Sequence, residues 1–254
     1  MAESTRREPV PQPSARIARH TPLVTPAPAR WLTALTWFAP LFAMAAQAYF
    51  VSQSAPDRDM GHLQKIMYVH VPAAWSAFLA FFWVFAQSIR YLVTRNERAD
   101  LQAASAAEVG AVFTGLTLAL GSIWGRPTWG IWWTWDARLT STAVLFLMFV
   151  GYLALRGLTD DPDRRARWSA VVGILGALNV PIVYMSVKWW RTLHQPQSSP
   201  GTLDPFYTLG LRTNAVAFSF LLILFIAHRY RTHVAQRVRE MAQDAAALQR
   251  RRTT

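Results

Sequence analysis

Tryptophan is concentrated in one short segment of this chain, Trp124–Asp136, whose sequence is WGRPTWGIWWTWD. Five of the twelve tryptophans of the chain lie in it. An aromatic belt at a membrane interface spreads tryptophans over many helix ends, so a belt alone explains this clustering poorly. Stacking and burial of area suit such an aromatic surface to a flat, apolar ligand. The segment is therefore predicted to bind a ligand of that kind, and Trp124, Trp129, Trp132, Trp133 and Trp135 are its candidate contacts.

Charged residues frame the tryptophan segment. Arg126 and Arg138 are placed to pair with anionic groups on the rim of the ligand. Asp136 is expected either to pair with one of these arginines or to cap the helix that follows. The second role fits because aspartate is a favourable residue at a helix N-terminus.

Two histidines stand beside aromatic residues elsewhere in the chain. His70 lies in the sequence YVHVPAA, where Pro72 suggests the first turn of a helix, and His194 closes the sequence WWRTLH. Neutral imidazole is a common iron ligand, and two histidines from separate segments can approach opposite faces of one porphyrin. A lone histidine at an interface is more often structural. The residues by themselves therefore leave haem ligation and a structural role both open.

Six apolar blocks determine the expected fold class. Apolar residues make up 52% of the 254 residues and charged residues 16%. A helix of about 20 apolar residues crosses the hydrocarbon core, and a spanning chain must satisfy its backbone internally. We therefore predict an all-α integral membrane protein with six transmembrane helices, near residues 31–51, 72–93, 103–123, 139–155, 168–187 and 207–227.

The positive charges predict the orientation of these helices. With both termini in the cytoplasm, 19 of the 26 Lys and Arg residues fall on the inner side and seven on the outer side. This bias agrees with the positive-inside rule, so we read the net charge of +12 as topological and expect no nucleic-acid partner. The predicted parts are a disordered basic cytoplasmic tail (1–30), a six-helix membrane domain (31–230) with outer loops 52–71, 124–138 and 188–206, and a cytoplasmic tail (231–254). The residues after Arg229 are expected to form a cytoplasmic helix.

The same topology divides the six histidines. His20, His228 and His233 fall on the inner side, whereas His62, His70 and His194 share the outer side with the tryptophan segment. Because His62 has no aromatic neighbours, it is expected to be an ordinary loop residue. His70 and His194 are thus the candidate ligands for anything that the tryptophan segment binds.

Other reactive residue types are scarce. The absence of cysteine excludes disulfides, thiolate metal sites and covalent haem attachment by this chain. There is no P-loop pattern, so the chain itself is not expected to hydrolyse ATP. Among the few polar residues inside the apolar blocks, Glu108 is expected either to extend to the inner membrane interface or to pair with a cytoplasmic arginine. Gln47, Gln87 and Asn179 have no assigned role.

Three motifs together resemble a known family. The tryptophan segment, with Ala137–Ser141 after it, resembles the WWD signature of haem-handling proteins in cytochrome c biogenesis. The two histidine motifs resemble those of the haem exporter protein C (CcmC) family of bacterial cytochrome c maturation. The three motifs agree in order and spacing, and the resemblance covers nearly all of the chain from the first helix to the last.

The resemblance implies a site and a role. His70 and His194 would be the axial ligands of a non-covalent haem b on the periplasmic side. The platform for this haem would be formed by Trp129, Trp132, Trp133, Trp135 and Asp136. The protein would sit in the bacterial inner membrane and deliver haem to a periplasmic haem chaperone. Its other partners would be an ATP-binding cassette subunit that hydrolyses ATP, a second membrane subunit and a small single-helix subunit.

Two positions depart from the pattern of the family, and two alternative functions stay open. Thr142 and Ala143 stand where many relatives are expected to carry an acidic residue, so no carboxylate role is carried over to the fourth helix. Arg126 stands where lysine is also common. A b-type haem electron-transfer subunit is one alternative function, although it would usually hold its histidines within transmembrane helices. A small-molecule transporter is the other, and the polar midplane groups or broken helices that it needs are sparse.

Overall fold

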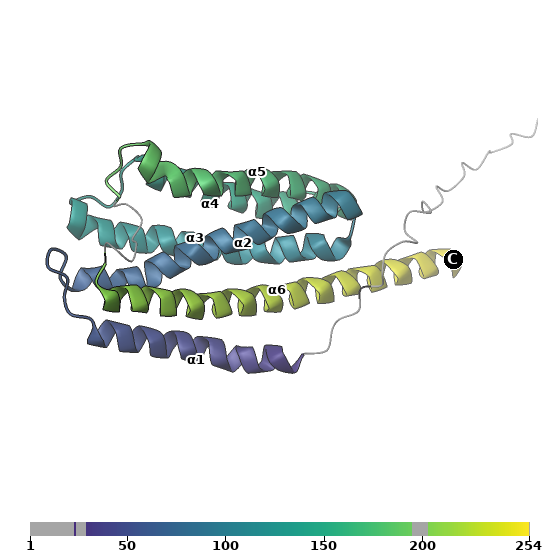
Figure 1. Cartoon of the computed structure of the whole chain (residues 1–254). Coiled ribbons are helices and arrows are strands. Elements are labelled where there is room, and N and C mark those ends of the chain that lie inside the picture. The colour runs from purple at the N-terminus through teal and green to yellow at the C-terminus, as the bar shows by residue number, and fades with distance from the viewer. Residues whose placement is uncertain (1–22, 24–28, 195–202, 254) are drawn as a thin grey trace, which may run out of the picture.

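Long helices form a single bundle in the computed structural model of the chain (Figure 1). The structure describes residue 23, residues 29–194 and residues 203–253, and six helices within this part are long and apolar enough to cross a membrane. This confirms the predicted fold class. The helices are α1 (Arg30–Gln53), α2 (Met67–Thr94), α3 (Glu97–Trp129), α4 (Ala137–Gly157), α5 (Pro162–Trp189) and α6 (Pro205–Thr253), with a short 3-10 helix, η2 (His62–Ile66), before α2.

Helix α2 lies at the centre of the bundle, in contact with α3, α5 and α6, while α1 packs along α6 (Figure 1). Small residues bring α2 and α3 close together. A Cβ atom at Gly110 would lie 2.5 Å from the Phe81 ring, and alanines fill much of the remaining contact. Close approach through small residues is typical of helix packing in membranes. Phe81 in turn stacks on Phe149 of α4, with 3.7 Å between ring centroids.

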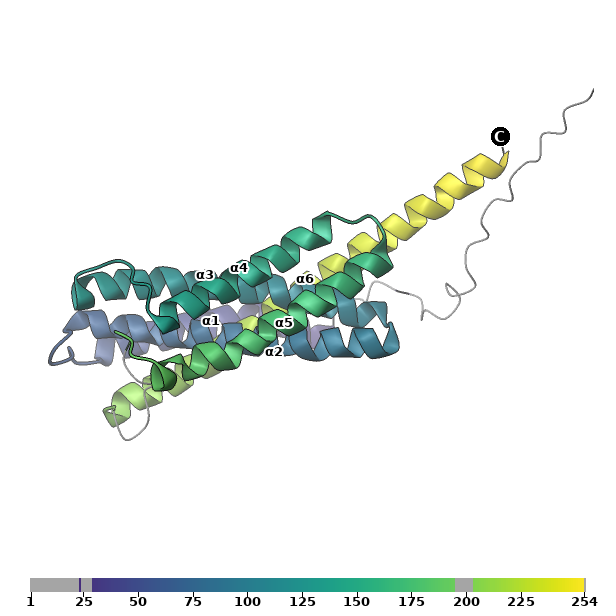
Figure 2. The ribbon, with the colours of Figure 1, turned by 90° about the horizontal axis from the view of Figure 1, so that it is seen from above.

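The end of α3 differs clearly from the sequence prediction. Residues 124–138 were expected to form a loop, but α3 continues to Trp129 and only residues 130–136 are non-helical. The helix passes Pro127 and stops where Gly130 adopts φ +80°, a conformation that favours glycine. Residues 231–253 are helical, as expected for the tail, and they continue α6 without a break. The helix extends beyond the other helices (Figure 1, Figure 2), because no glycine or proline follows Gly210 to end it. Most of the predicted 1–30 tail lies outside the described residues.

The two ends of the bundle differ in chemistry. We call the end that holds Trp124–Asp136 the tryptophan end and the opposite end the charged end. At the charged end, Glu108 pairs with Arg229 and His233 of α6. Pairing with an arginine on this side was one of the expected roles of Glu108. Asp100 and Arg156 form a nearly buried ion pair with two hydrogen bonds, of 2.6 and 2.8 Å. These contacts tie α3 to α4 and α6.

The Asp100–Arg156 pair generates a stability prediction. Arg156→Met would leave the Asp100 carboxylate buried without a partner, at a cost of roughly 3–5 kcal/mol, because a buried charge needs compensation. We expect a lower midpoint of thermal unfolding in detergent, followed by circular dichroism. Arg95→Met is the matched control, since Arg95 and Asp163 form an exposed pair at 3.8 Å, which should contribute at most about 1 kcal/mol. Equal midpoints for the two variants would contradict the prediction.

Candidate functional site

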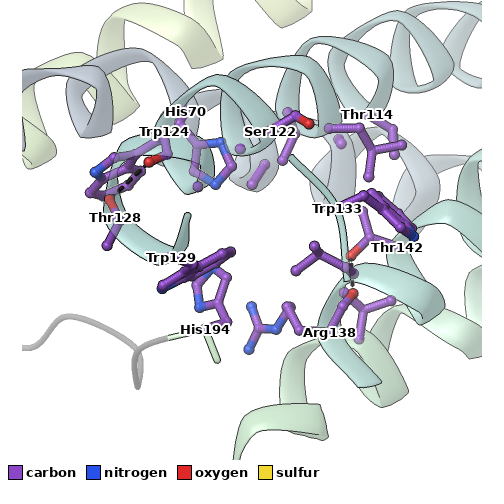
Figure 3. Close-up of a pocket in the computed structure, with 18 of the residues that line it drawn as sticks. His70, Thr114, Ser122, Trp124, Thr128, Trp129, Trp133, Arg138, Thr142 and His194 are labelled. Carbon is purple, nitrogen blue, oxygen red and sulfur yellow. Dashed lines mark hydrogen bonds between the residues drawn. The ribbon is translucent and has the colours of Figure 1, made fainter. Parts of the chain in front are cut away.

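A cavity opens between α2, α3 and α4 at the tryptophan end of the bundle (Figure 3). Its volume is about 850 Å³, including the space at its open mouth. The walls are mainly apolar and aromatic, and the only charged side chain among the lining residues that the structure describes is Arg138. The cavity thus suits a ligand that is largely apolar but carries an anionic group.

His70 reaches this cavity from the first turn of α2, the position that Pro72 predicted. Gly121 of α3 lies directly opposite, and a Cβ atom there would be 3.0 Å from His70 Cε1. Glycine at this position therefore lets the imidazole pack against α3. The Trp124 ring meets His70 edge-on, with 5.8 Å between ring centroids. His70 Nδ1 is buried and has no hydrogen-bond partner within the protein.

His194 reaches the same cavity from the non-helical segment that follows α5. Figure 3 shows the His70 and His194 rings on different sides of the open space, with Trp129 next to His194. The centroids of the Trp129 and His194 rings are 6.4 Å apart. Sequence reasoning paired these two histidines, and the structure brings them together at one cavity.

Asp136 links the two non-helical segments of the site. Its Oδ1 accepts a hydrogen bond from Leu139 N at 2.8 Å and so caps α4, one of the two roles expected for it. Its Oδ2 accepts hydrogen bonds from Thr192 Oγ1 at 2.6 Å and from Leu193 N at 3.2 Å. The carboxylate therefore holds residues 192–193 against the start of α4, directly before His194. This second contact was missed because it joins positions that are far apart in the sequence.

The tryptophans of the segment separate into two groups. Trp124, Trp129 and Trp133 line the cavity. Trp132 and Trp135 do not line it and are 59% and 79% exposed. Ser122 of α3 donates a hydrogen bond to the Trp132 carbonyl at 2.6 Å and so holds the extended segment against the helix. Trp124 Nε1 and Trp133 Nε1 are buried donors without a partner within the protein.

The two arginines also separate. Arg138 lines the cavity and donates to α5 through Nε to Ser186 Oγ at 3.0 Å and Nη2 to the Tyr184 carbonyl at 3.1 Å. Arg126 is exposed, does not line the cavity and donates to the Gly130 carbonyl at 2.8 Å. Only Arg138 is thus in a position to meet a ligand inside the cavity.

Sequence reasoning also missed part of the wall. The inner faces of α2 and α3 contribute small and hydroxyl side chains one helical turn apart. Residues spaced by three and four share a helix face, so this periodicity running from His70 and Trp124 could have identified them. The small and hydroxyl residues concerned are Ala74, Ala77, Thr114, Thr117 and Gly121, and the aliphatic Leu118 lies on the same face.

These features restrict the chemistry of the ligand. Imidazole nitrogens bind transition metals, but the described residues contain no group of three or more His, Cys, Asp or Glu that could hold a bare metal ion. Two imidazoles instead suit a metal whose other ligands arrive with it. A flat aromatic macrocycle would bury its area against the tryptophans, and its anionic groups would find one arginine and the unpartnered indole N–H groups.

Comparison with known proteins agrees with this site. The family model described as "CcmC: Heme exporter protein C" matches residues 17–245. The chain is 41% identical to Heme exporter protein C of Bradyrhizobium diazoefficiens over 85% of this chain and 83% of that protein. It is 38% identical to Heme exporter protein C of Escherichia coli K12 over 74% and 79%, respectively. A putative cytochrome c biosynthesis ccmC-like mitochondrial protein of Marchantia polymorpha is 40% identical over 67% and 71%. The chain therefore belongs to the Heme exporter protein C family.

Proposed function

We propose that this protein holds haem b non-covalently at the periplasmic face of the bacterial inner membrane and presents it to a periplasmic haem chaperone. The role belongs to c-type cytochrome biogenesis, as family membership supports. One observation carries the proposal. Two histidines from separate segments meet at one tryptophan-lined cavity whose only charged lining residue, among those described, is an arginine.

Each lining residue has a proposed task. The imidazoles of His70 and His194 bind the haem iron from its two axial sides, and saturation of the iron would prevent oxygen chemistry during transfer. Trp124, Trp129 and Trp133 cover the macrocycle, while Arg138 pairs with a propionate. The buried indole N–H groups of Trp124 and Trp133 would gain acceptors when the propionates enter.

Residues outside the cavity have a second task in this proposal. Trp132, Trp135 and Arg126 lie on the same segments but face away from the cavity lining. They form the surface that the haem edge reaches as it passes to the chaperone. Asp136 is a positioning residue, because its carboxylate fixes the segment that carries His194.

The orientation and the partners complete the proposal. The excess of Lys and Arg in the segments of the charged end supports cytoplasmic termini and a periplasmic tryptophan end. The protein is a haem-handling subunit and not itself an enzyme. An ATP-binding cassette subunit, a second membrane subunit and a small single-helix subunit would complete the complex, and the ATP would be hydrolysed by the partner.

The ligand assignment is tested by the absorption spectrum of purified protein loaded with hemin. Wild type should give the low-spin spectrum of bis-histidine haem, whereas His70→Ala and His194→Ala should each shift it towards a high-spin form. His62→Ala is the matched control, since His62 does not line the cavity. A spectrum that neither cavity variant changes would exclude the axial assignment, and a wild-type protein that takes up no hemin would exclude the whole proposal.

The role of Asp136 is tested by Asp136→Ala. We expect the spectral change of His194→Ala, because residues 192–193 lose their acceptor and His194 is no longer held at the cavity. Asp161→Ala is the matched control, since Asp161 caps α5 in the same way through Asp163 N and Arg164 N. Each variant should lose roughly 1 kcal/mol of stability from its cap. A normal low-spin spectrum in Asp136→Ala would contradict the positioning role.

The orientation is tested by single cysteines, because the natural chain has none. In intact cells with a permeabilised outer membrane, a membrane-impermeant maleimide should label Trp135→Cys but not Leu248→Cys. Both side chains are well exposed, at 79% and 57%, so burial would not explain a difference. After cell lysis both should react. The reverse pattern in intact cells would place the tryptophan end in the cytoplasm and contradict the orientation.

A further inference from the structure

Pro72 leaves one backbone carbonyl of the His70 turn without its helical partner. In an α-helix the carbonyl of residue 68 accepts a hydrogen bond from the N–H of residue 72, and proline has no N–H. Tyr68 is fully buried, so water cannot replace the missing donor. An unpaired buried carbonyl destabilises the structure around it. Another group in the protein therefore has to donate to the Tyr68 carbonyl.

Gln47 of α1 is that donor. Its Nε2 donates to the Tyr68 carbonyl at 2.7 Å and to Asn214 Oδ1 at 2.8 Å. The amide nitrogen of Asn214, a fully buried residue, donates to the Gly210 carbonyl at 2.9 Å within α6. Because Asn214 uses its nitrogen on its own helix, its oxygen is left to accept from Gln47. Gln47 of α1 thus donates to both α2 and α6, and these hydrogen bonds link the three helices.

The Tyr68 side chain strengthens the same contact. Gly210 leaves room for it, since a Cβ atom at Gly210 would lie 2.5 Å from Tyr68 Cε1. Tyr207 stacks on Tyr68 with 5.6 Å between centroids, and the Tyr68 hydroxyl is 2.6 Å from Ser54 Oγ. The back of this turn is therefore held by α1 and α6 through both its backbone and its side chain.

His70 lies on the opposite face of the same turn. Successive helical residues are rotated by about 100°, so side chains two positions apart point to opposite sides. Tyr68 faces α1 and α6, while His70 faces Gly121 and the cavity (Figure 3). A shift or rotation of the turn at Tyr68 would therefore move the imidazole within the cavity.

We propose that Gln47 and Asn214 are positioning residues that hold His70 in place. Gln47 donates to the carbonyl that Pro72 leaves free, and Asn214 accepts a hydrogen bond from Gln47 and so orients its amide. The part of this inference that concerns haem rests on the proposed function, because it takes His70 as an iron ligand. The clamp itself is a property of the chain without haem. Neither Gln47 nor Asn214 lines the cavity, so their effect on a ligand would act through His70.

The first test measures hydrogen–deuterium exchange of the α2 amides near His70 in purified, hemin-free protein. In Gln47→Leu, exchange of residues 69–76 should be roughly tenfold faster, because an unpaired carbonyl loosens the turn by about the free energy of one hydrogen bond. Asn214→Leu should act in the same direction but less strongly. Asn179→Leu is the matched control. The Asn179 amide of α5 donates to the Ser141 carbonyl of α4 at 2.9 Å, so this hydrogen bond does not involve α2. Equal exchange in Gln47→Leu and Asn179→Leu would overturn the inference.

The second test is rescue by Pro72→Ala. Alanine supplies an N–H to the Tyr68 carbonyl, so Gln47→Leu should add little exchange in that background. A merely structural role of Gln47 in helix packing would give the same increase in both backgrounds, which would overturn the inference.

The third test links the clamp to haem. With hemin bound, Gln47→Leu should lower the low-spin fraction, and Pro72→Ala should restore it, whereas Asn179→Leu should leave it unchanged. Because exchange is measured without hemin, its failure is distinct from failure of the proposed function, which the His70→Ala spectrum tests independently. A low-spin fraction that stays at the wild-type value in Gln47→Leu, while His70→Ala lowers it, would overturn the positioning role.

Discussion

The backbone of a membrane-spanning chain has to find its hydrogen-bond partners within the protein, since the hydrocarbon core offers none. Within the helices this happens by default. At the tryptophan end the helices begin, stop and are interrupted, and side chains supply the missing partners. Gln47 donates to the carbonyl freed by Pro72, and Asp136 accepts from the first turn of α4. Arg126 donates to the carbonyl of Gly130, where α3 stops.

These side-chain hydrogen bonds to the backbone also position the residues that face the cavity. The Gln47 contact lies behind His70, and the Asp136 contact lies next to His194, so each histidine is held by a polar group on another segment. The arrangement leaves both imidazoles at the rim of the helical bundle and not at its centre. A b-type electron-transfer subunit would usually hold both ligands on transmembrane helices. Here one proposed ligand lies on a helix and the other on a short non-helical segment, which would suit a haem that has to leave.

The charged end shows the opposite chemistry. Its carboxylates are matched with arginines across helices, as in the Asp100–Arg156 and Glu97–Arg237 pairs. Around the cavity at the tryptophan end, three buried nitrogens lack a partner within the protein: His70 Nδ1, Trp124 Nε1 and Trp133 Nε1. Buried polar groups are normally satisfied, so these three nitrogens agree with a site that gains partners from its ligand. One end of the bundle thus fastens the helices together, and the other remains open to a ligand.

The sequence by itself determined the class of fold, the helices as apolar blocks and the pairing of His70 with His194 on one side of the membrane. Hydrophobic length and charge bias are properties of neighbouring residues, so they can be read along the chain. The division of the tryptophans, the outward placement of Arg126, and the contacts of Asp136 and Gln47 were decided only by the tertiary structure. Each of these depends on which way a side chain points when distant segments meet. Pro72 could be seen in the sequence to free a carbonyl, but only the packing of α1 against α2 and α6 showed that Gln47 is the group that donates to it.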